Sequence, residues 1–352
     1  MTKVKVRRIT TTLPLIEETP DNIPILIDDT SLAHYLGINC YLLWYCLRRA
    51  TLTPAANDKS AYNIIPIKKR NGKTRLLFAP HKQLQYVQKK IRDALIDILP
   101  KDLETSVAYE IGSRCGNTSQ EIAGAPVIIQ LDIKNFFPSI TQKKVKEFLS
   151  SVGYQPAVSE LIAGILCVLH NGRRFLPQGG PASPMVANRV AESLIDPVVK
   201  RNLPIGWRYK RYCDNLYIWP ENMERNREVS HVALLKDISE GIARVGFRTH
   251  KHKIAPYYRS QRVLGFTVNV KANCPKNVYL SLRATLHNCL KHGVKSQMYK
   301  SKRFGFKGET IENYISYLSG KVTYYTPYMS EGKARKITEA LRAVTHIAEE
   351  GA

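Results

Sequence analysis

The sequence has no long apolar run. No stretch approaches the roughly 18–20 apolar residues that a membrane-spanning helix needs, so we expect no membrane partner. The basic residues near the N-terminus are not followed by an apolar segment, which is unlike a secretory signal. We therefore expect the protein to be cytoplasmic.

Paired cysteines are absent as well. The seven cysteines form no Cys-x-x-Cys pair, and several lie in apolar runs such as "GILCVL". This distribution predicts reduced, buried thiols in place of a zinc site or a disulfide framework. The sequence also contains no internal repeat and no low-complexity tract.

Acidic residues are few beside basic ones. The 352 residues include 53 Lys plus Arg but only 29 Asp plus Glu, a formal net charge of +24. Such an excess favours a polyanionic partner, and nucleic acid is the first candidate. The hydrophobic content of 44% is that of a globular chain, and the length allows two or three packed subdomains.

Periodicity predicts a mixture of helices and strands. The expected helices cover residues 31–50 with a break near Gly37, then 81–100, 141–153, 156–170, the end of the segment 176–201, 228–245 and most of the chain after 278. The expected strands are a hairpin around Asn71-Gly72, a buried strand that ends at Asp132, a hairpin over 208–220, and two segments at 246–258 and 261–270.

Two aspartates stand at the ends of predicted strands. Asp132 follows the buried strand, and Asp214 lies with Asn215 at the expected tip of the hairpin "RYKRYCDNLYIWP". If the two strands are neighbours, the carboxylates converge, and they repel each other unless cations lie between them. Mg²⁺ accepts one or two carboxylates and completes its shell with water and phosphate oxygens. A lone aspartate after a strand is as often a turn or a helix cap, so the surrounding motifs decide the interpretation.

Several segments in a fixed order resemble the motifs of one family, the retron and group II intron type of reverse transcriptase. The resemblance covers roughly residues 60–325. The similar segments are "IPIKKRNGKTRLLFAP", "LDIKNFFPSI", "LPQGGPASPMVANRV", "YCDN" in place of Tyr-x-Asp-Asp, "GFRTHKHKI" with "VLGFTVN", and "YISYLSGKVTYY". The resemblance implies an α+β right-hand polymerase fold with an N-terminal extension (1–58), fingers (59–125), a palm (126–270) and a helical thumb (271–352).

The same resemblance implies an activity and its partners. The protein would be an RNA-directed DNA polymerase that copies a dedicated structured non-coding RNA into cDNA from dNTPs. It would use two Mg²⁺ ions, with Mn²⁺ as a substitute. Two alternatives stay open: a catalytically impaired RNA-binding scaffold of the same fold, and a template-independent DNA polymerase.

Individual residues take roles from the family's motifs. Asp132 and Asp214, with Ile133 beside them, would hold the metals. Lys253 would act on the leaving pyrophosphate, and Tyr212 would lie near the primer end. The expected nucleotide contacts are Lys73, Arg75, Gln178, Gly179, Phe137 as the gate against a ribose 2′-hydroxyl, and its neighbour Phe136. Alternation along a strand would make Phe136 the better core residue.

Other basic residues are expected to contact nucleic acid. The segment 291–308 interleaves basic and aromatic residues, and its expected contacts are Lys291, Lys300, Lys302 and Arg303. We interpret His250 and His252 as surface or nucleic-acid contacts in preference to zinc ligands, because no acid or cysteine pair accompanies them.

Two departures from the family pattern matter. Asn215 stands where the family has a second aspartate. It is compatible with an introduced Asp→Asn change, with a natural Asp-Asn site like that of some viral RNA polymerases, or with a non-catalytic scaffold. Furthermore, "GNTSQEIAG" and "RVLGF" stand where retron enzymes usually have Asn-Ala-x-x-His and Val-Thr-Gly. The chain therefore looks closer to the defence-associated bacterial reverse transcriptases, which act during phage infection.

Overall fold

The computed structural model describes most of the chain. The described residues are 6–7, 16–17, 24–52, 60–68, 72, 74–100, 103–109, 112–227, 229–303 and 305–350. The chain divides into two compact units, of which the first comprises Met1–Ser113 with Ile129–Ile254 and the second Arg114–Ile128 with Ala255–Ala352. The finer boundaries of fingers, palm and thumb stay a prediction.

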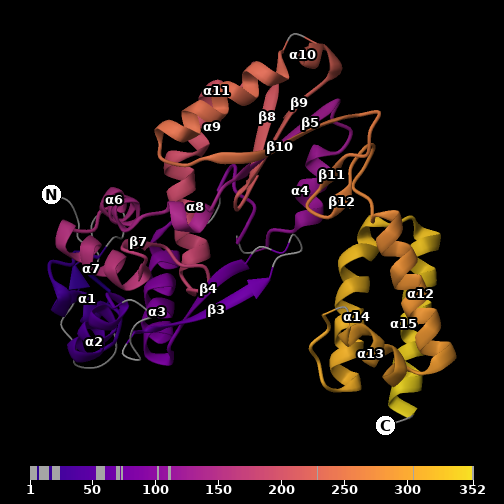
Figure 1. Ribbon diagram of the computed structural model, residues 1–352, viewed down its shortest axis with the longest axis horizontal. Coiled ribbons are helices and arrows are strands. Elements are labelled where there is room, and N and C mark those ends of the chain that lie inside the picture. Colours follow the sequence, from indigo (N-terminus) through magenta and orange to yellow (C-terminus); the bar gives the residue numbers. More distant parts are fainter. Residues whose placement is uncertain are drawn as a thin grey trace. The chain divides into compact units, whose positions relative to one another are not determined.

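A four-stranded sheet forms the centre of the first unit. Its order is β10 (Thr249–Pro256), β5 (Val127–Ile133), β9 (Asn215–Pro220) and β8 (Trp207–Tyr212). Strand β9 is antiparallel to both β5 and β8. The apolar side chains of β5 are buried on both faces of the strand, as the predicted buried strand requires. Figure 1 shows the strands of this sheet close together.

Helices supply the remaining core of this region. They are α8 (Ser183–Leu194), α9 (Asp196–Asn202) and α11 (His231–Arg244), while the short α10 (Met223–Arg227) between β9 and α11 buries no residue. Helix α11 contacts α9 and buries Leu234, Leu235, Ile238 and Ile242. Both helices run beside the sheet in Figure 1. The predicted helix at 228–245 is thus confirmed, with its start at the N-cap Ser230.

The expected fingers hairpin is present. Strands β3 (Tyr62–Lys68) and β4 (Thr74–Pro80) are antiparallel, while Asn71 of the predicted turn lies outside the described residues. Helix α3 (Lys82–Ile98) contacts β4 and packs with α1 (Asp29–Tyr35), α2 (Cys40–Ala50), α6 (Gln142–Val152) and α7 (Pro156–Leu166) in one helical cluster. The side chains of Asp28 and Asn39 cap α1 and α2, so the break near Gly37 is confirmed.

The predicted helix at 156–170 is wrong at its end. Helix α7 ends at Leu166, and β6 (Val168–His170) pairs with β7 (Arg173–Phe175). Asn171 and Gly172 connect the two strands, with φ of 49° and 70°. Asn-Gly with two positive φ values is the favoured two-residue hairpin turn, so this dipeptide was the signal that the helical interpretation overlooked.

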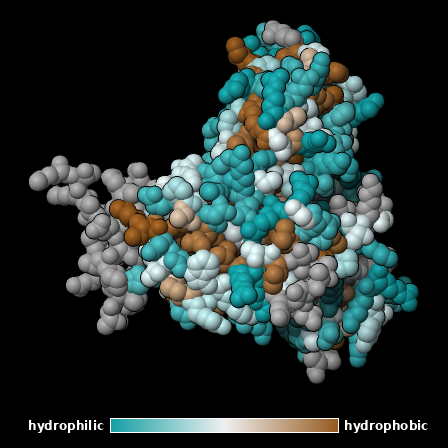
Figure 2. Space-filling view, turned by 60° about the vertical axis from the view of Figure 1, so that its left-hand side comes forward, coloured by the Kyte–Doolittle hydropathy of each residue, from teal (hydrophilic) through white to brown (hydrophobic). Residues whose placement is uncertain are grey.

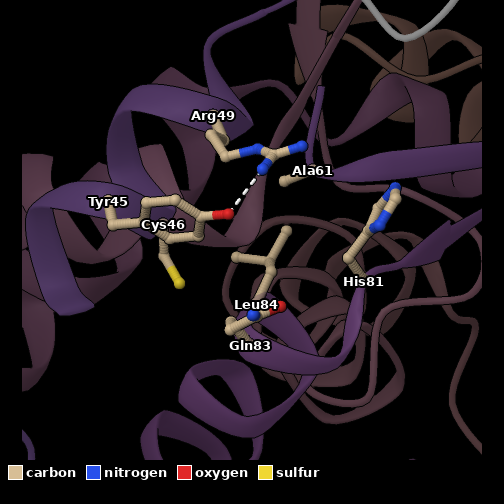
Figure 3. A pocket seen from close by; sticks show the side chains of 7 residues that line it. All are labelled: Tyr45, Cys46, Arg49, Ala61, His81, Gln83 and Leu84. Atoms are coloured by element: carbon tan, nitrogen blue, oxygen red, sulfur yellow. Dashed lines mark hydrogen bonds between the residues drawn. The ribbon is translucent and has the colours of Figure 1, made fainter. Parts of the chain in front are cut away.

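A small cavity lies among the N-terminal helices. It lies between α2, Ala61 and the start of α3, and its volume is about 20 Å³. Figure 3 shows the Arg49 side chain hydrogen-bonded to the Tyr45 hydroxyl at its edge. A space of this size holds about one water molecule, so it offers no room for a substrate.

The second unit contains a helical bundle. Its helices are α12 (Lys276–His292), α13 (Val294–Lys302), α14 (Ile311–Tyr325) and α15 (Glu331–Glu350), with a 3₁₀ turn η1 (Thr326–Tyr328) between the last two. They share an apolar core built around Leu286, Tyr314 and Val344, all fully buried. The expected helical C-terminal region is confirmed. Helix α4 (Cys115–Ile122) and the short strands β11 (Arg262–Val263) and β12 (Phe266–Thr267) complete this unit.

Two further observations bear on the sequence predictions. All seven cysteines are free, and five of them are buried, as expected for reduced thiols. No helix among the described residues is long and apolar enough to cross a membrane. The described surface visible in Figure 2 is largely hydrophilic, with hydrophobic residues in separate small patches.

Strands β1 (Val6–Arg7) and β2 (Ile16–Glu17) pair near the N-terminus.

Candidate active site

A tight hairpin turn brings Asp214 to the end of strand β5. Cys213 and Asp214 form the turn between β8 and β9, and Cys213 has a left-handed φ of 56°. The backbone N–H of Ile133 donates to the Asp214 carbonyl at 2.9 Å. The two expected aspartates are therefore adjacent. Asn215 is not part of the tip as predicted: it is the first residue of β9 and pairs with both Asp132 and Tyr212.

The two carboxylates interact electrostatically. Burial raises the pKa of Asp214, and the negative charge of Asp132 raises it further. Positive charge on Arg75 and His250 acts in the opposite direction on the same pKa. The raised pKa means that the folded protein holds the Asp214 carboxylate in surroundings that disfavour its charge. A bound cation would instead favour the charged form of the Asp214 carboxylate.

Asn215 is engaged with its neighbour. Its side-chain Nδ2 donates a hydrogen bond to Asp214 Oδ1 at 2.8 Å. An aspartate at this position has no proton to donate at neutral pH and would add a third negative charge. The amide therefore stabilises the Asp214 carboxylate in a way that the family's usual acid does not.

His250 was missed as a site residue by the sequence interpretation. Its Nδ1 lies 3.0 Å from Asp132 Oδ1, and the two side chains are 35% and 30% exposed. The contact arises because β10 lies beside β5 in the sheet. No spacing in the sequence signals this pairing, since strand order is decided by the fold. His252 and Lys253 are exposed on the same strand, and the role of Lys253 stays a prediction.

The loop with Gln178 is fixed to the fingers hairpin. The Phe78 N–H donates to the Gln178 carbonyl at 2.8 Å. Gly179 has a φ of +120°, and a Cβ atom there would lie 2.7 Å from the Phe78 carbonyl oxygen. Only glycine permits this backbone approach. Arg75 lies on β4 within electrostatic reach of Asp214, whereas Lys73 is outside the described residues.

The two phenylalanines after Asp132 are helical, so the argument from strand alternation is wrong. Asn135, with φ of 50°, turns the chain into the short helix α5 (Phe136–Ser139). Phe136 is 3% exposed and its ring centre lies 6.3 Å from that of Phe247, as expected of a core residue, and its contact with the nucleotide stays a prediction. Phe137, 8% exposed, lies beside it and is the remaining candidate for the gate.

A tyrosine that the sequence did not indicate supports the turn. The Tyr109 hydroxyl donates to Cys213 Sγ at 3.4 Å. Burial raises the pKa of Tyr109, with the Cys213 contact as the next cause. Tyr109 has a φ of 62°, which costs an aromatic residue on the order of 1–3 kcal/mol. Strained residues of this kind gather at functional sites, and this one contacts the residue that precedes Asp214.

A fully buried ion pair anchors β8 just before the turn. Arg211 Nε lies 2.8 Å from Asp196 Oδ1, and the side chains are 0% and 3% exposed. Arg211 also donates to the Asn188 side chain and backbone at 3.0 and 3.2 Å. Asp196 accepts further hydrogen bonds from Thr105 and Tyr209. The network joins α8, α9 and β8, so it fixes the strand that carries the turn.

The acid pair fits a metal that arrives with substrate. Within the described part of the chain, no three His, Cys, Asp or Glu side chains are grouped to hold a metal. Mg²⁺ does not require such a cage, because one or two carboxylates, waters and substrate phosphates complete its shell. Asp132 and Asp214 would supply the carboxylates and the Ile133 carbonyl a further oxygen, and these ligand roles stay predictions.

The expected thumb contacts lie in the second unit. Lys291 is exposed on α12, Lys300 and Lys302 are exposed on α13, and Arg303 follows them. The Lys302 ammonium lies 5.5 Å from the centre of the Tyr299 ring, which is itself exposed. This basic and aromatic surface suits a phosphate backbone, and its role stays a prediction.

The chain is similar to known proteins. Residues 67–268 match the family described as reverse transcriptase (RNA-dependent DNA polymerase), in agreement with the expected α+β polymerase fold. The Myxococcus xanthus retron Mx162 reverse transcriptase is 28% identical over 80% of this chain, which spans 61% of that enzyme. The Mx65 enzyme of the same organism is 25% identical over 89% of this chain and 72% of its own length. The expected resemblance to retron-type enzymes is confirmed.

Two solved structures are also similar. The Sicinivirus 3Dpol RNA-dependent RNA polymerase has a TM-score of 0.48 and 11% identity, over 95% of this chain and 69% of its own. Telomerase from Candida albicans has a TM-score of 0.45 and 10% identity, over 80% of this chain and 61% of its own.

Removing one partner of the buried ion pair tests its contribution to stability. Arg211→Met leaves the Asp196 charge buried without a cation, so we expect the free energy of unfolding to fall by about 3–5 kcal/mol. Arg208→Met on the same strand is the matched control, because its ion pair with Glu221 is exposed. Loss of an exposed pair costs roughly 0–1 kcal/mol. Equal losses in urea unfolding would contradict this account.

The raised pKa of Asp214 predicts a pH-dependent stability. The folded state holds the proton to higher pH than the unfolded chain, whose aspartate pKa is about 3.9. The free energy of unfolding therefore falls as the pH rises from the unfolded pKa of this carboxyl to its higher folded pKa. In EDTA at pH 7 we expect Asp214→Asn to raise the melting temperature, and this gain to vanish at pH values below the unfolded pKa. A lower melting temperature at pH 7 would show that the carboxylate is not under repulsion.

Proposed function

Because the chain belongs to the reverse transcriptase (RNA-dependent DNA polymerase) family, we propose that it copies an RNA template into DNA from dNTPs. One observation carries the proposal: the hairpin turn holds Asp214 beside the end of the strand that carries Asp132, with Arg75 in electrostatic reach. An acid pair next to a cationic side chain is the arrangement that a metal-bound triphosphate needs.

The reaction joins a primer 3′ oxygen to the α-phosphorus of the nucleotide and releases pyrophosphate. Bound Mg²⁺ supplies activation of the attacking hydroxyl and neutralises charge on the phosphates. Asp132 and Asp214 would hold it, and Mn²⁺ would substitute. His250 would fix the orientation of Asp132 through its hydrogen bond. The mutual repulsion of the two acids, unfavourable in the free protein, would favour binding of the cation.

Other residues of the chain would position the nucleotide. The guanidinium of Arg75 would bind the triphosphate, because its planar donors match phosphate oxygens. Gln178 and Gly179 would contact the nucleotide from a loop that is fixed to β4 through Phe78. Lys253 is a candidate proton donor to the leaving pyrophosphate.

We propose a dedicated structured RNA as the template. The excess of positive charge and the basic surface of α13 suit such a ligand, because most affinity for nucleic acid comes from phosphate neutralisation. The relatives named as retron reverse transcriptases support the bacterial setting. We extend the proposal to a role in anti-phage defence, where a non-coding RNA would be copied into cDNA.

A second candidate function is a catalytically impaired RNA-binding scaffold. The observation that favours it is the hydrogen bond from Asn215 to Asp214, which replaces a metal-binding carboxylate by a donor. Primer extension with and without RNA separates these functions. Synthesis that needs no RNA would indicate the template-independent polymerase, and RNA binding without synthesis by any variant would indicate the scaffold.

Substitution at position 215 tests the enzyme directly. Asn215→Asp restores the carboxylate of the family pattern, so we expect incorporation to become at least about tenfold faster, a barrier change of roughly 1.4 kcal/mol. The variant should need less Mg²⁺, and the parent should gain more from Mn²⁺. Single-turnover extension across a metal titration measures both effects.

The matched control is Asn222→Asp, which adds the same charge at an exposed position of the same unit. It should leave the rate unchanged. In EDTA, Asn215→Asp should also melt at a lower temperature than the parent, because it adds a third negative charge. Equal rates for parent and Asn215→Asp at every metal concentration would identify Asn215 as a sufficient natural ligand.

Sugar selection tests the gate. Phe137→Ala removes the ring expected to exclude a ribose 2′-hydroxyl, so we expect ribonucleotide incorporation to rise while RNA binding is retained. Phe136→Ala is the matched control, since it deletes a neighbouring buried ring. Deleting a buried Phe costs about 3–5 kcal/mol of stability in either position, but only the change at 137 should alter the ratio of dNTP to rNTP incorporation. An unchanged ratio would make Phe137 a core residue alone.

A further inference from the structure

A basic pocket lies next to the candidate active site, and its lining includes Lys134 and Asn135 from the segment that follows Asp132. Its volume is about 610 Å³, within the range of small-molecule sites. The segment after β5, the start of α6, strand β7 and the loop after α11 form its walls. None of the proposed catalytic or nucleotide-binding side chains lines it.

The charged side chains of this pocket are all cationic. Lys134, Lys144, Arg173 and Arg248 line it, and no carboxylate does. Among the described residues, no acid lies within ion-pair distance of any of these four. Like charges in one pocket repel each other, so an anion of several negative charges would relieve more of that repulsion than a single chloride.

Lys144 is the most constrained of the four. Its ammonium donates to the carbonyls of Ser139 and Gly246 at 3.2 and 2.9 Å. Partial burial lowers its pKa to about 8, while the negative charge of Glu147 acts in the opposite direction on this pKa. Gly246 has a φ of +77°, and a Cβ atom there would lie only 3.0 Å from Lys144 Nζ. The backbone is thus shaped to hold this ammonium at the pocket.

The pocket walls suit phosphate better than a nucleobase. Lys144 Nζ lies 3.7 Å from the centre of the Phe247 ring and covers it, so this ring is not free to stack on a base. The hydroxyls of Ser139 and Thr141 and the amide of Asn135 add hydrogen-bonding groups. Thr141 also caps the 11-residue helix α6, whose positive end favours anions.

We propose that this pocket binds a polyphosphate, either pyrophosphate or the phosphate tail of a free nucleotide. The pocket is formed in part by the segment between Asp132 and Phe137, since Lys134 and Asn135 line it, and the Lys134 N–H donates to the Arg248 carbonyl at 2.7 Å. An occupant would restrain this segment. The effect of this restraint on catalysis rests on the proposed function, whereas the binding of polyphosphate does not.

Titration calorimetry of the full chain with pyrophosphate and with tripolyphosphate tests the proposal. EDTA is present so that metal-dependent binding at the acid pair does not contribute. We expect one site, weakened about tenfold by Lys144→Met and by Arg173→Gln, since each removes a charge-assisted contact. Arg173 is exposed, so its variant gives the answer even if Lys144→Met fails to fold.

Two controls separate this site from its surroundings. Lys143→Met removes an equal charge from the next residue, whose side chain is 83% exposed and pairs with Glu147 at 3.8 Å. It should change the affinity by less than about twofold, because exposed charges at a distance are screened by salt. Arg75→Gln alters the proposed nucleotide site and should leave polyphosphate binding in EDTA intact.

Three results would overturn the proposal. They are unchanged affinity in both Lys144→Met and Arg173→Gln, loss of binding in Arg75→Gln, and binding of an oligonucleotide backbone without measurable binding of pyrophosphate. A dNTP that binds no better than tripolyphosphate would identify the phosphate tail as the recognised part. Binding in EDTA does not depend on DNA synthesis, so an inactive protein that still binds pyrophosphate would refute the proposed function alone.

Discussion

The ion pair between Arg211 and Asp196 is the interaction on which the palm depends. Burying two charges costs several kcal/mol per ion, and the cost is offset only when the remaining hydrogen-bonding groups are satisfied. Here Asn188, Thr105 and Tyr209 satisfy them. The network also ties segments far apart in the sequence to one strand. Two residues beyond Arg211, that strand begins the turn that presents Asp214.

The candidate active site has the opposite energetics. Asp132 and Asp214 repel each other, and Tyr109 and Cys213 hold left-handed backbone conformations beside them. Each of these features destabilises the folded chain, and the satisfied network directly behind the turn compensates. Strain and repulsion at a site supported by a rigid core are typical of functional positions, where stability and activity conflict.

Charge is arranged unevenly around the strand that carries Asp132. The acids lie at the turn, while four cations line a pocket that the segment after the same strand helps to form. The overall excess of positive charge is therefore not spread uniformly over a solvated surface. Part of this positive charge is concentrated in one pocket that no carboxylate lines. Diffuse electrostatic attraction to nucleic acid does not require such a concentration.

Local signals in the sequence determined much of this protein. The buried strand before Asp132, the hairpin before Asp214 and the capped helices at Asp28 and Asn39 follow from patterns within a few residues. Where the predictions were wrong, the cause was also local. The strand before the Asn171-Gly172 turn was predicted as helix, and the left-handed Asn135 begins helix α5 where the argument from alternation assumed a strand.

Only the tertiary structure decided which distant residues meet. The pairing of His250 with Asp132 depends on the order of the strands, in which β10 lies next to β5. The burial of Arg211 depends on α9 packing against its strand, although the sequence shows an ordinary basic residue there. The sequence motifs alone predict a site that contains two aspartates. Its electrostatics come from contacts between residues far apart in the chain, because the free energy of a charge depends on every group packed around it.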